Sequence, residues 1–208
     1  MKTILVLAHA QSQHHEDKRV GGWYDTGLTA LGREQAAKAA NRISRIVGNS
    51  HTRLYSSDLK RAYETAEFVQ RFLDTPIIPR EELREYRYGV AEGRSQTWLD
   101  DRFLAPPKSG NRLDHEVCPG SDTRRRFATR IYRIMDEIIA EDQAVSIIVT
   151  HGFALTFVIA CWIKMPIESV DYVNFKSSPA GITLLVEGDW LHNRGVKFMN
   201  CRDHLDTD

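Results

Sequence analysis

Short apolar runs that are typical of buried strands alternate along this chain with longer segments of helical period. A helical segment that opens near Thr29 follows the first run, and another, capped by Ser57, follows the second. Because parallel strands need such long crossover connections, the alternation predicts an α/β fold. We expect a three-layer sandwich, with a mostly parallel central sheet covered by helices on both faces. The predicted strands are residues 4–7, 53–56, 76–79, 145–150, 182–186 and 196–200.

The chain of 208 residues is long enough for one sizeable domain, and we expect a single domain over residues 1–208. Residues from about 86 to 120 have no clean period and are interrupted by proline and glycine. Long irregular segments in compact domains usually serve a function. We therefore expect this segment to be a surface excursion that shapes a substrate pocket.

The charges balance, with 28 Lys and Arg against 28 Asp and Glu. A chain without net charge offers no overall field to attract nucleic acid or an anionic membrane. Five arginines gather between Arg124 and Arg133 on a segment with an apolar helical face. We expect them to form the solvated outer face of that helix rather than a nucleic-acid site.

Cysteine usage and hydropathy point to a cytoplasmic protein. Cys118, Cys161 and Cys201 are odd in number and widely separated, which suits a reducing compartment and fits neither a disulfide framework nor a zinc site. The longest apolar run, residues 153–163, is far shorter than the ~20 residues that span a bilayer. The apolar run at residues 4–7 is too short for the core of a signal peptide.

Two predicted strands end in the same way, with a histidine directly after the last apolar residues. His9 follows Leu7-Ala8, and His151 follows Val149-Thr150. The carboxyl ends of parallel strands meet at one edge of a sheet, where α/β proteins bind their ligands. A single histidine in such a place is usually a structural residue, but two in equivalent positions indicate a site.

Arg61 and Glu85 add charge to this edge. Arg61 lies one turn into the helix that follows the second strand, where free backbone N–H groups and a guanidinium fork together suit phosphate oxygens. Glu85 lies in "LREYRYG", and a lone glutamate in so charged a run is usually exposed to solvent.

These stretches occur in a fixed order that covers nearly the whole chain. The chain resembles the histidine phosphatase superfamily, the phosphoglycerate-mutase-like family of phosphohistidine enzymes, and most closely its phosphatase branch. The matching motifs are "HAQS" at 9–12, "GGWYDTGLTALGREQA" at 21–36, "LYSSDLKRAYETA" at 54–66, "LREYRYGVAEG" at 83–93, "VTHG" at 149–152 and the ending "MNCRDHL" at 199–205.

The resemblance implies a role for each of four residues. His9 would be the nucleophile that takes the phosphoryl group onto a ring nitrogen. Arg61 and His151 would hold the equatorial oxygens and stabilise the charge of the transition state. Glu85 would protonate the leaving oxygen and then deprotonate the attacking water, which requires a raised pKa.

Four further residues are expected at the phosphate. Gly152 would let the backbone approach it, and His15 falls where the family often has an asparagine that contacts it. Gln11 and Ser12 are also candidates, although Ser12 could serve only to fix the loop. No cofactor or metal is expected, because the neighbouring His14 and His15 lack the i, i+3 or i+4 spacing of helical metal ligands.

Ala8 departs from the family pattern, which has an arginine at this position that grips the transferred phosphoryl group. Loss of one preorganised oxyanion donor costs ~10²–10³ in rate, and an arginine on a phosphoryl group is worth ~10³–10⁵. We therefore expect strongly impaired catalysis. Since the other members of the site are present, we interpret Ala8 as an engineered substitution, and a natural change is the alternative that the sequence leaves open.

The sequence thus predicts a phosphatase that hydrolyses a small phosphorylated metabolite through phosphohistidine, with no nucleic acid or membrane as partner. Two alternatives stay open, a metal-independent phosphomutase of the phosphoglycerate mutase type and a non-catalytic pseudoenzyme that binds phosphorylated ligands. The oligomeric state is open as well, a homodimer included.

Overall fold

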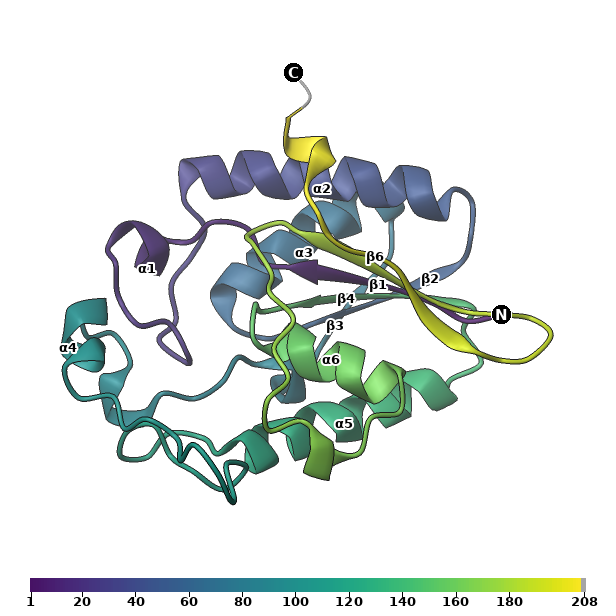
Figure 1. The fold of residues 1–208 in the computed structure, drawn as a ribbon. Coiled ribbons are helices and arrows are strands. Elements are labelled where there is room, and N and C mark those ends of the chain that lie inside the picture. Colours follow the sequence, from purple (N-terminus) through teal and green to yellow (C-terminus); the bar gives the residue numbers. More distant parts are fainter. Residues whose placement is uncertain (207–208) are drawn as a thin grey trace.

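The computed structural model describes residues 1–206, which form a six-stranded sheet between two layers of helices (Figure 1). The strand order is β3-β2-β4-β1-β5-β6. The first four strands in this order are parallel, β5 is antiparallel to β1, and β6 is antiparallel to β5. The predicted α/β sandwich with a mostly parallel sheet is confirmed. The strands are β1 (Thr3–Ala8), β2 (Thr52–Ser56), β3 (Ile77–Pro79), β4 (Val145–Thr150), β5 (Ile182–Glu187) and β6 (Arg194–Cys201).

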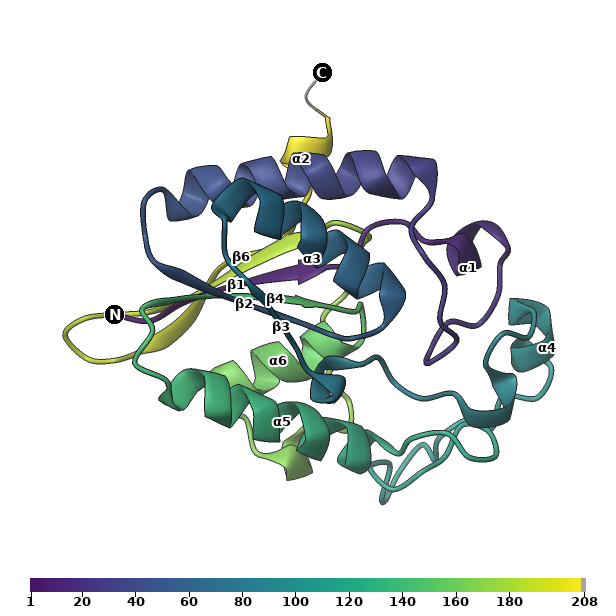
Figure 2. The same ribbon diagram turned by 180° about the vertical axis from the view of Figure 1, so that it is seen from behind.

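Helices α2 (Ala30–Val47) and α3 (Lys60–Leu73) cover one face of the sheet, and α5 (Arg124–Ala140) and α6 (Ala154–Trp162) cover the other (Figure 2). The short helices α1 (Gln13–Glu16) and α4 (Gln96–Asp100) lie in the loops that follow β1 and β3. Within residues 1–206, no helix combines the length and the apolar character needed to cross a bilayer.

The strands are apolar on both faces because both faces are covered. Leu5 and Leu7 of β1 pack with α2 and α3, whereas Ile4 and Val6 pack with α5 and α6. Successive side chains of a strand point to opposite faces, so a continuous apolar run is what a doubly covered strand requires. The first strand is the example that the sequence shows most clearly.

The two predicted helix caps have different outcomes. Thr29 caps α2 as predicted, since its hydroxyl accepts a hydrogen bond from the Gly32 amide at 2.9 Å. The prediction for Ser57 is wrong, because Leu59 occupies the N-cap of α3 and its side chain makes no capping bond. The Ser57 hydroxyl contacts His151 instead.

The segment from 86 to 120 is mostly irregular. Together with the loop of α1, it lies beyond the carboxyl ends of the parallel strands (Figure 1). Its two ends are joined at Gly89, where a side chain would lie 2.4 Å from the Pro119 carbonyl oxygen. Gly89 also has φ +54°, so glycine is required there for two independent reasons.

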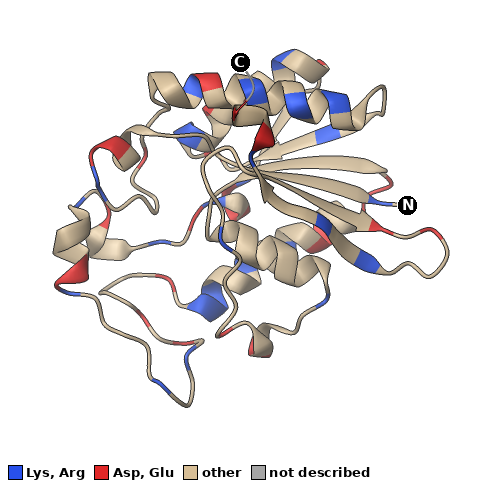
Figure 3. Ribbon diagram, turned by 45° about the horizontal axis from the view of Figure 1, so that its top comes forward, with Lys and Arg blue, Asp and Glu red and all other residues tan. Residues whose placement is uncertain are grey.

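Basic and acidic side chains are interspersed over the helices and loops in the view of Figure 3. The expectation of a solvated arginine face on α5 is wrong for two of its five arginines. Arg126 and Arg133 are exposed and form ion pairs with Glu116 and Glu82. Arg124 turns toward the Val170 carbonyl oxygen in the segment between α6 and β5, and Arg130 turns toward the segment that carries Glu85.

Candidate active site

The ends of β1 and β4 bring the two predicted histidines together. Ala8 and Thr150 are partners in the register of these neighbouring strands, so the residues that follow them leave the sheet side by side. The His9 and His151 rings meet edge to face with their centroids 5.1 Å apart. Both side chains are buried, His151 completely.

His9 has one ring nitrogen that carries no proton. Its Nδ1 lies 2.8 Å from the Ala10 carbonyl oxygen, which can only accept a hydrogen bond, so the proton of the ring is on Nδ1. Nε2 is therefore unprotonated, and its lone pair accepts a hydrogen bond from Arg61 Nε at 3.2 Å, which must break before this nitrogen can attack. Burial, followed by the Arg61 charge, lowers the pKa of His9 well below its usual value.

Arg61 is held rigidly beneath the site by the glycine-containing loop. Its Nη1 and Nη2 donate to the carbonyl oxygens of Tyr24 at 3.1 Å and Gly22 at 2.7 Å. The side chain is 1% exposed, and burial lowers its pKa to about 10, so the guanidinium remains charged at neutral pH. A buried, fixed cation of this kind is preorganised for an anionic ligand.

His151 is positioned by Ser57, with 2.8 Å between its Nε2 and the Ser57 hydroxyl. Its Nδ1 is buried and has no hydrogen-bond partner among the described residues. Burial and the Arg61 charge lower the pKa of His151 well below its usual value. In the tautomer in which the Ser57 hydroxyl donates to Nε2, the proton of the neutral ring lies on Nδ1, a donor that an oxyanion would satisfy.

Glu85 lies against the same cavity and is less exposed than its charged neighbourhood in the sequence indicates. Its two carboxylate oxygens accept hydrogen bonds from the backbone amides of Tyr86 at 2.7 Å and Phe153 at 3.0 Å. Burial raises the pKa of Glu85 in spite of these bonds. A carboxyl group with a raised pKa is suited to give and take a proton.

The backbone of the Glu85 segment is held by Arg130 of α5. Arg130 Nη1 donates to the carbonyl oxygens of Glu82 at 2.7 Å and Arg84 at 2.8 Å, and its Nη2 donates to that of Glu85 at 3.0 Å. The Trp23 indole N–H donates to the same Glu85 oxygen at 2.9 Å. Helix α5, which follows the excursion in the sequence, thus fixes the backbone that carries the Glu85 carboxyl group.

His15 lies beside His9 and lines the same cavity. Its ring stacks on that of His9, with 5.5 Å between centroids and 14° between planes. Its Nδ1 accepts from the Ser12 amide at 3.2 Å, which leaves Nε2 as the protonated nitrogen of the neutral ring. His14 is turned inward, within 2.9 Å of the Ser12 hydroxyl.

Gln11 and Ser12 brace the loop and do not line the cavity. The Gln11 side-chain oxygen accepts from the Thr29 hydroxyl at 2.7 Å, and Ser12 contacts both neighbouring histidines. Ala8 lies at the base of a small adjoining cavity of about 90 Å³, which it shares with His15 and Gly152.

The main cavity has a volume of about 280 Å³ and brings together His9, His15, Arg61, Glu85 and Gly152. Tyr88 and Gln96 of the 86–120 segment also line it. The sequence pointed to this segment as a wall of the pocket but not to these two residues, because a segment without a clean period does not show which side chains point inward. Ser57 was visible in the sequence, but as a helix cap. Among residues 1–206, no three His, Cys, Asp or Glu side chains are grouped so as to hold a metal ion.

Comparisons with known proteins agree with this arrangement. A sequence model of the histidine phosphatase superfamily (branch 1) matches residues 4–193. A protein of Hydrogenobacter thermophilus named "Putative phosphoserine phosphatase 2" is 28% identical over 195 residues, covering 91% of this chain and 92% of its own. The "Probable phosphoglycerate mutase GpmB" of Proteus mirabilis is 26% identical over 208 residues, covering 92% and 95%.

Solved structures show the same fold. A mycobacterial glucosyl-3-phosphoglycerate phosphatase in complex with VO3 has a TM-score of 0.79 and 23% identity, covering 97% of this chain and 100% of its own. A structure described as a putative α-ribazole-5'-P phosphatase from Escherichia coli has a TM-score of 0.77 and 21% identity, covering 97% of both chains. The matched sequence and the shared fold show that this chain belongs to the histidine phosphatase superfamily, branch 1.

Proposed function

We propose that this protein hydrolyses a small phosphate monoester through a phosphohistidine intermediate on His9. The observation that carries the proposal is the geometry at His9 Nε2, which carries no proton on a neutral ring and lies 3.2 Å from a buried arginine nitrogen. A nucleophile and a preorganised cation at one point are what phosphoryl transfer requires.

In the first step, His9 Nε2 attacks phosphorus. The N–P bond forms, the P–O bond to the alcohol breaks, and protonated Glu85 gives its proton to the leaving oxygen. In the second step, water attacks the phosphoryl group, Glu85 takes a proton from the water, and the N–P bond breaks to release inorganic phosphate and neutral His9. Arg61, His15 and His151 stabilise the charge on the equatorial oxygens in both steps.

Ala8 weakens this machinery. Two nitrogens of Arg61 donate to backbone carbonyl oxygens, so an arginine at position 8 would add hydrogen-bond donors for the phosphate that the site otherwise lacks. Its charge would also oppose protonation of His9. We expect the chain to be strongly impaired for this reason, and the engineered origin of Ala8 stays an interpretation of the sequence.

The substrate we propose is a small metabolite in a reducing cytoplasm, turned over without a cofactor. A cavity of about 280 Å³ accommodates a phosphate and a short leaving group rather than a polymer. The phosphatases among the comparisons carry names that refer to small phosphorylated compounds. The single domain and the excursion that shapes its pocket are part of the same proposal.

The test is phosphate release from p-nitrophenyl phosphate by the Ala8 protein and by Ala8→Arg. We expect Ala8→Arg to raise kcat/KM by ~10²-fold or more, with an unchanged melting temperature, and His9→Ala to abolish release from both proteins. A normally folded Ala8→Arg variant that gains nothing on any ester, while the Ala8 protein binds phosphorylated ligands tightly, would support the pseudoenzyme.

The mutase alternative is tested in the same variant with 3-phosphoglycerate and a bisphosphoglycerate primer. The hydrolase proposal requires phosphate release to exceed interconversion of the phosphoglycerates. Faster interconversion would replace it with the phosphomutase, an outcome to which the mutase name of the Proteus mirabilis relative gives weight.

A further inference from the structure

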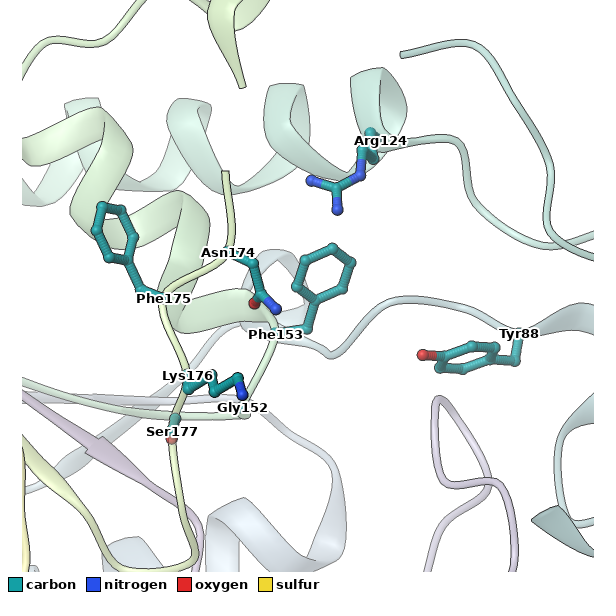
Figure 4. A pocket seen from close by; sticks show the side chains of 8 residues that line it. All are labelled: Tyr88, Arg124, Gly152, Phe153, Asn174, Phe175, Lys176 and Ser177. Carbon is teal, nitrogen blue, oxygen red and sulfur yellow. The ribbon is translucent and has the colours of Figure 1, made fainter. Parts of the chain in front are cut away.

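A second cavity has a volume of about 420 Å³ (Figure 4). It lies next to the catalytic cavity, because Gly152 and Tyr88 line both. Its lining includes two cationic side chains, Arg124 and Lys176, and no carboxylate. A space of this size and charge beside the phosphate site has no role in the mechanism described above.

Arg124 is the exception among the arginines of α5. The other four form ion pairs with carboxylates within 4 Å, whereas no ion pair of Arg124 occurs among residues 1–206. Its Nη1 donates to the carbonyl oxygens of Val170 at 3.1 Å and Val173 at 3.0 Å, which fix the guanidinium and leave its other nitrogens available. The guanidinium is half-buried and lines the cavity, so these donors can bind an anion there.

The guanidinium of Arg124 also lies over the Phe153 ring, 5.1 Å from its centroid. Phe153 is the residue whose amide holds the Glu85 carboxylate. Phe153 thus contacts both Arg124 and Glu85, the group that protonates the leaving oxygen in the proposed reaction. A ligand in this cavity would therefore be part of the leaving alcohol.

Lys176 provides a second positive charge on the opposite wall, on the strand-free segment before β5, and its side chain extends toward Gly152 in Figure 4. The described part of the chain offers it no ion pair. The neighbouring Ser177 lines both this cavity and the small one at Ala8, and its buried hydroxyl has no hydrogen-bond partner among the described residues. Two cations and a free hydroxyl are donors that suit an oxyanion.

We propose that Arg124 and Lys176 form a second anion site, and that the substrate is a phosphate monoester whose alcohol part carries a carboxylate or a second phosphate. The proposal rests on the proposed function, because it assigns the leaving group of that reaction. Binding energy from such a remote group can be used to orient the ester for attack by His9.

The test compares ligands that differ in the second anion. 3-Phosphoglycerate and glycerol 3-phosphate share a three-carbon skeleton and differ by a carboxylate; fructose 1,6-bisphosphate and fructose 6-phosphate differ by a phosphate. Calorimetric Kd values are measured together with kcat/KM, so that binding is tested even without turnover. We expect roughly 10- to 100-fold tighter binding of the doubly anionic member of one pair, the range for a charged hydrogen bond.

Arg124→Gln and Lys176→Gln should each reduce this preference at least several-fold, whereas Arg126→Gln, an exposed arginine of the same helix, should keep it. A preference in the first pair assigns a carboxylate, and one in the second assigns a phosphate. Equal Kd values within both pairs, or equal weakening of both members by Lys176→Gln, would overturn the second site. Retained preference without release of phosphate from any ester would instead refute the proposed hydrolysis alone.

Discussion

The protonation states of His9 and Glu85 decide whether the chemistry can run. Attack requires His9 without a proton on Nε2, and departure of an alkoxide requires Glu85 with its proton. Burial lowers the pKa of His9 and raises that of Glu85. The same physical cause therefore moves the two groups in opposite directions, and each toward the form that the reaction needs.

This opposition predicts a bell-shaped pH profile for hydrolysis of an alkyl phosphate, limited by His9 on the acid side and by Glu85 on the alkaline side. kcat/KM rises as pH passes upward through the lowered pKa of His9 and falls as it passes through the raised pKa of Glu85. Glu85→Gln should slow alkyl phosphates far more than p-nitrophenyl phosphate, whose leaving group needs no proton, and should remove the alkaline limb.

The comparison is made with steady-state kinetics in the Ala8→Arg protein. Equal losses on the alkyl and aryl esters would mean that Glu85 does not act as the acid. An alkaline limb that survives in Glu85→Gln would assign that limb to another group.

At the scale of elements, strand ends and one helix build the site. β1 and β4 deliver the two histidines, whereas α5 fixes the Glu85 segment through Arg130. Arg130 is a positioning residue, because it contacts backbone carbonyls and an Asp122 carboxylate but does not line the catalytic cavity. A small displacement of a catalytic group can cost as much as 10²-fold in rate.

Arg130→Gln should therefore lower kcat on alkyl phosphates by roughly 10- to 100-fold and affect p-nitrophenyl phosphate much less. Arg133→Gln removes an exposed arginine from the same helix and is the matched control. The decisive quantity is the ratio of the alkyl to the aryl rate, since partial unfolding would lower both rates together. An unchanged ratio would show that Arg130 supports the fold and not the position of Glu85.

The sequence predicts those elements whose burial imposes a pattern. β1 and β4 are covered on both faces, so each appears in the sequence as a continuous apolar run. These runs predict both strands and the position of a histidine at the end of each. The sequence could not predict that Arg124 and Arg130 turn inward. Helical period separates an apolar face from a charged one, but it does not show which arginines bind carbonyl oxygens. The residues between Tyr88 and Gln96 that line the cavity could not be predicted either, since an irregular loop has no period.

At the scale of the whole molecule, the site destabilises the fold toward acid. His9, His14 and His151 are at most 7% exposed, and burial lowers the pKa of each, that of His14 to about 3. In the unfolded chain these groups take up protons near pH 6.5. Below that pH the unfolded state therefore binds more protons than the folded state, and the free energy of unfolding decreases as the pH is lowered.

Each such histidine costs ~1.4 kcal/mol per pH unit below its unfolded pKa, so the free energy of unfolding should drop by about 4 kcal/mol between pH 7.5 and 5.5. Urea titrations at the two pH values measure the difference. His14→Gln should reduce it by about a third. A free energy of unfolding that is the same at both pH values would show that these histidines are not held neutral.

The central claim is that His9 carries the phosphoryl group, and the most direct test is to trap it there. The Ala8→Arg protein is mixed with a labelled aryl phosphate, quenched in alkali within the first turnover, and digested for mass spectrometry. The account predicts acid-labile phosphate on the peptide that contains His9 and none in the His9→Asn variant. Rapid release of phosphate with no label on His9, or label on His15 or His151 instead, would contradict it.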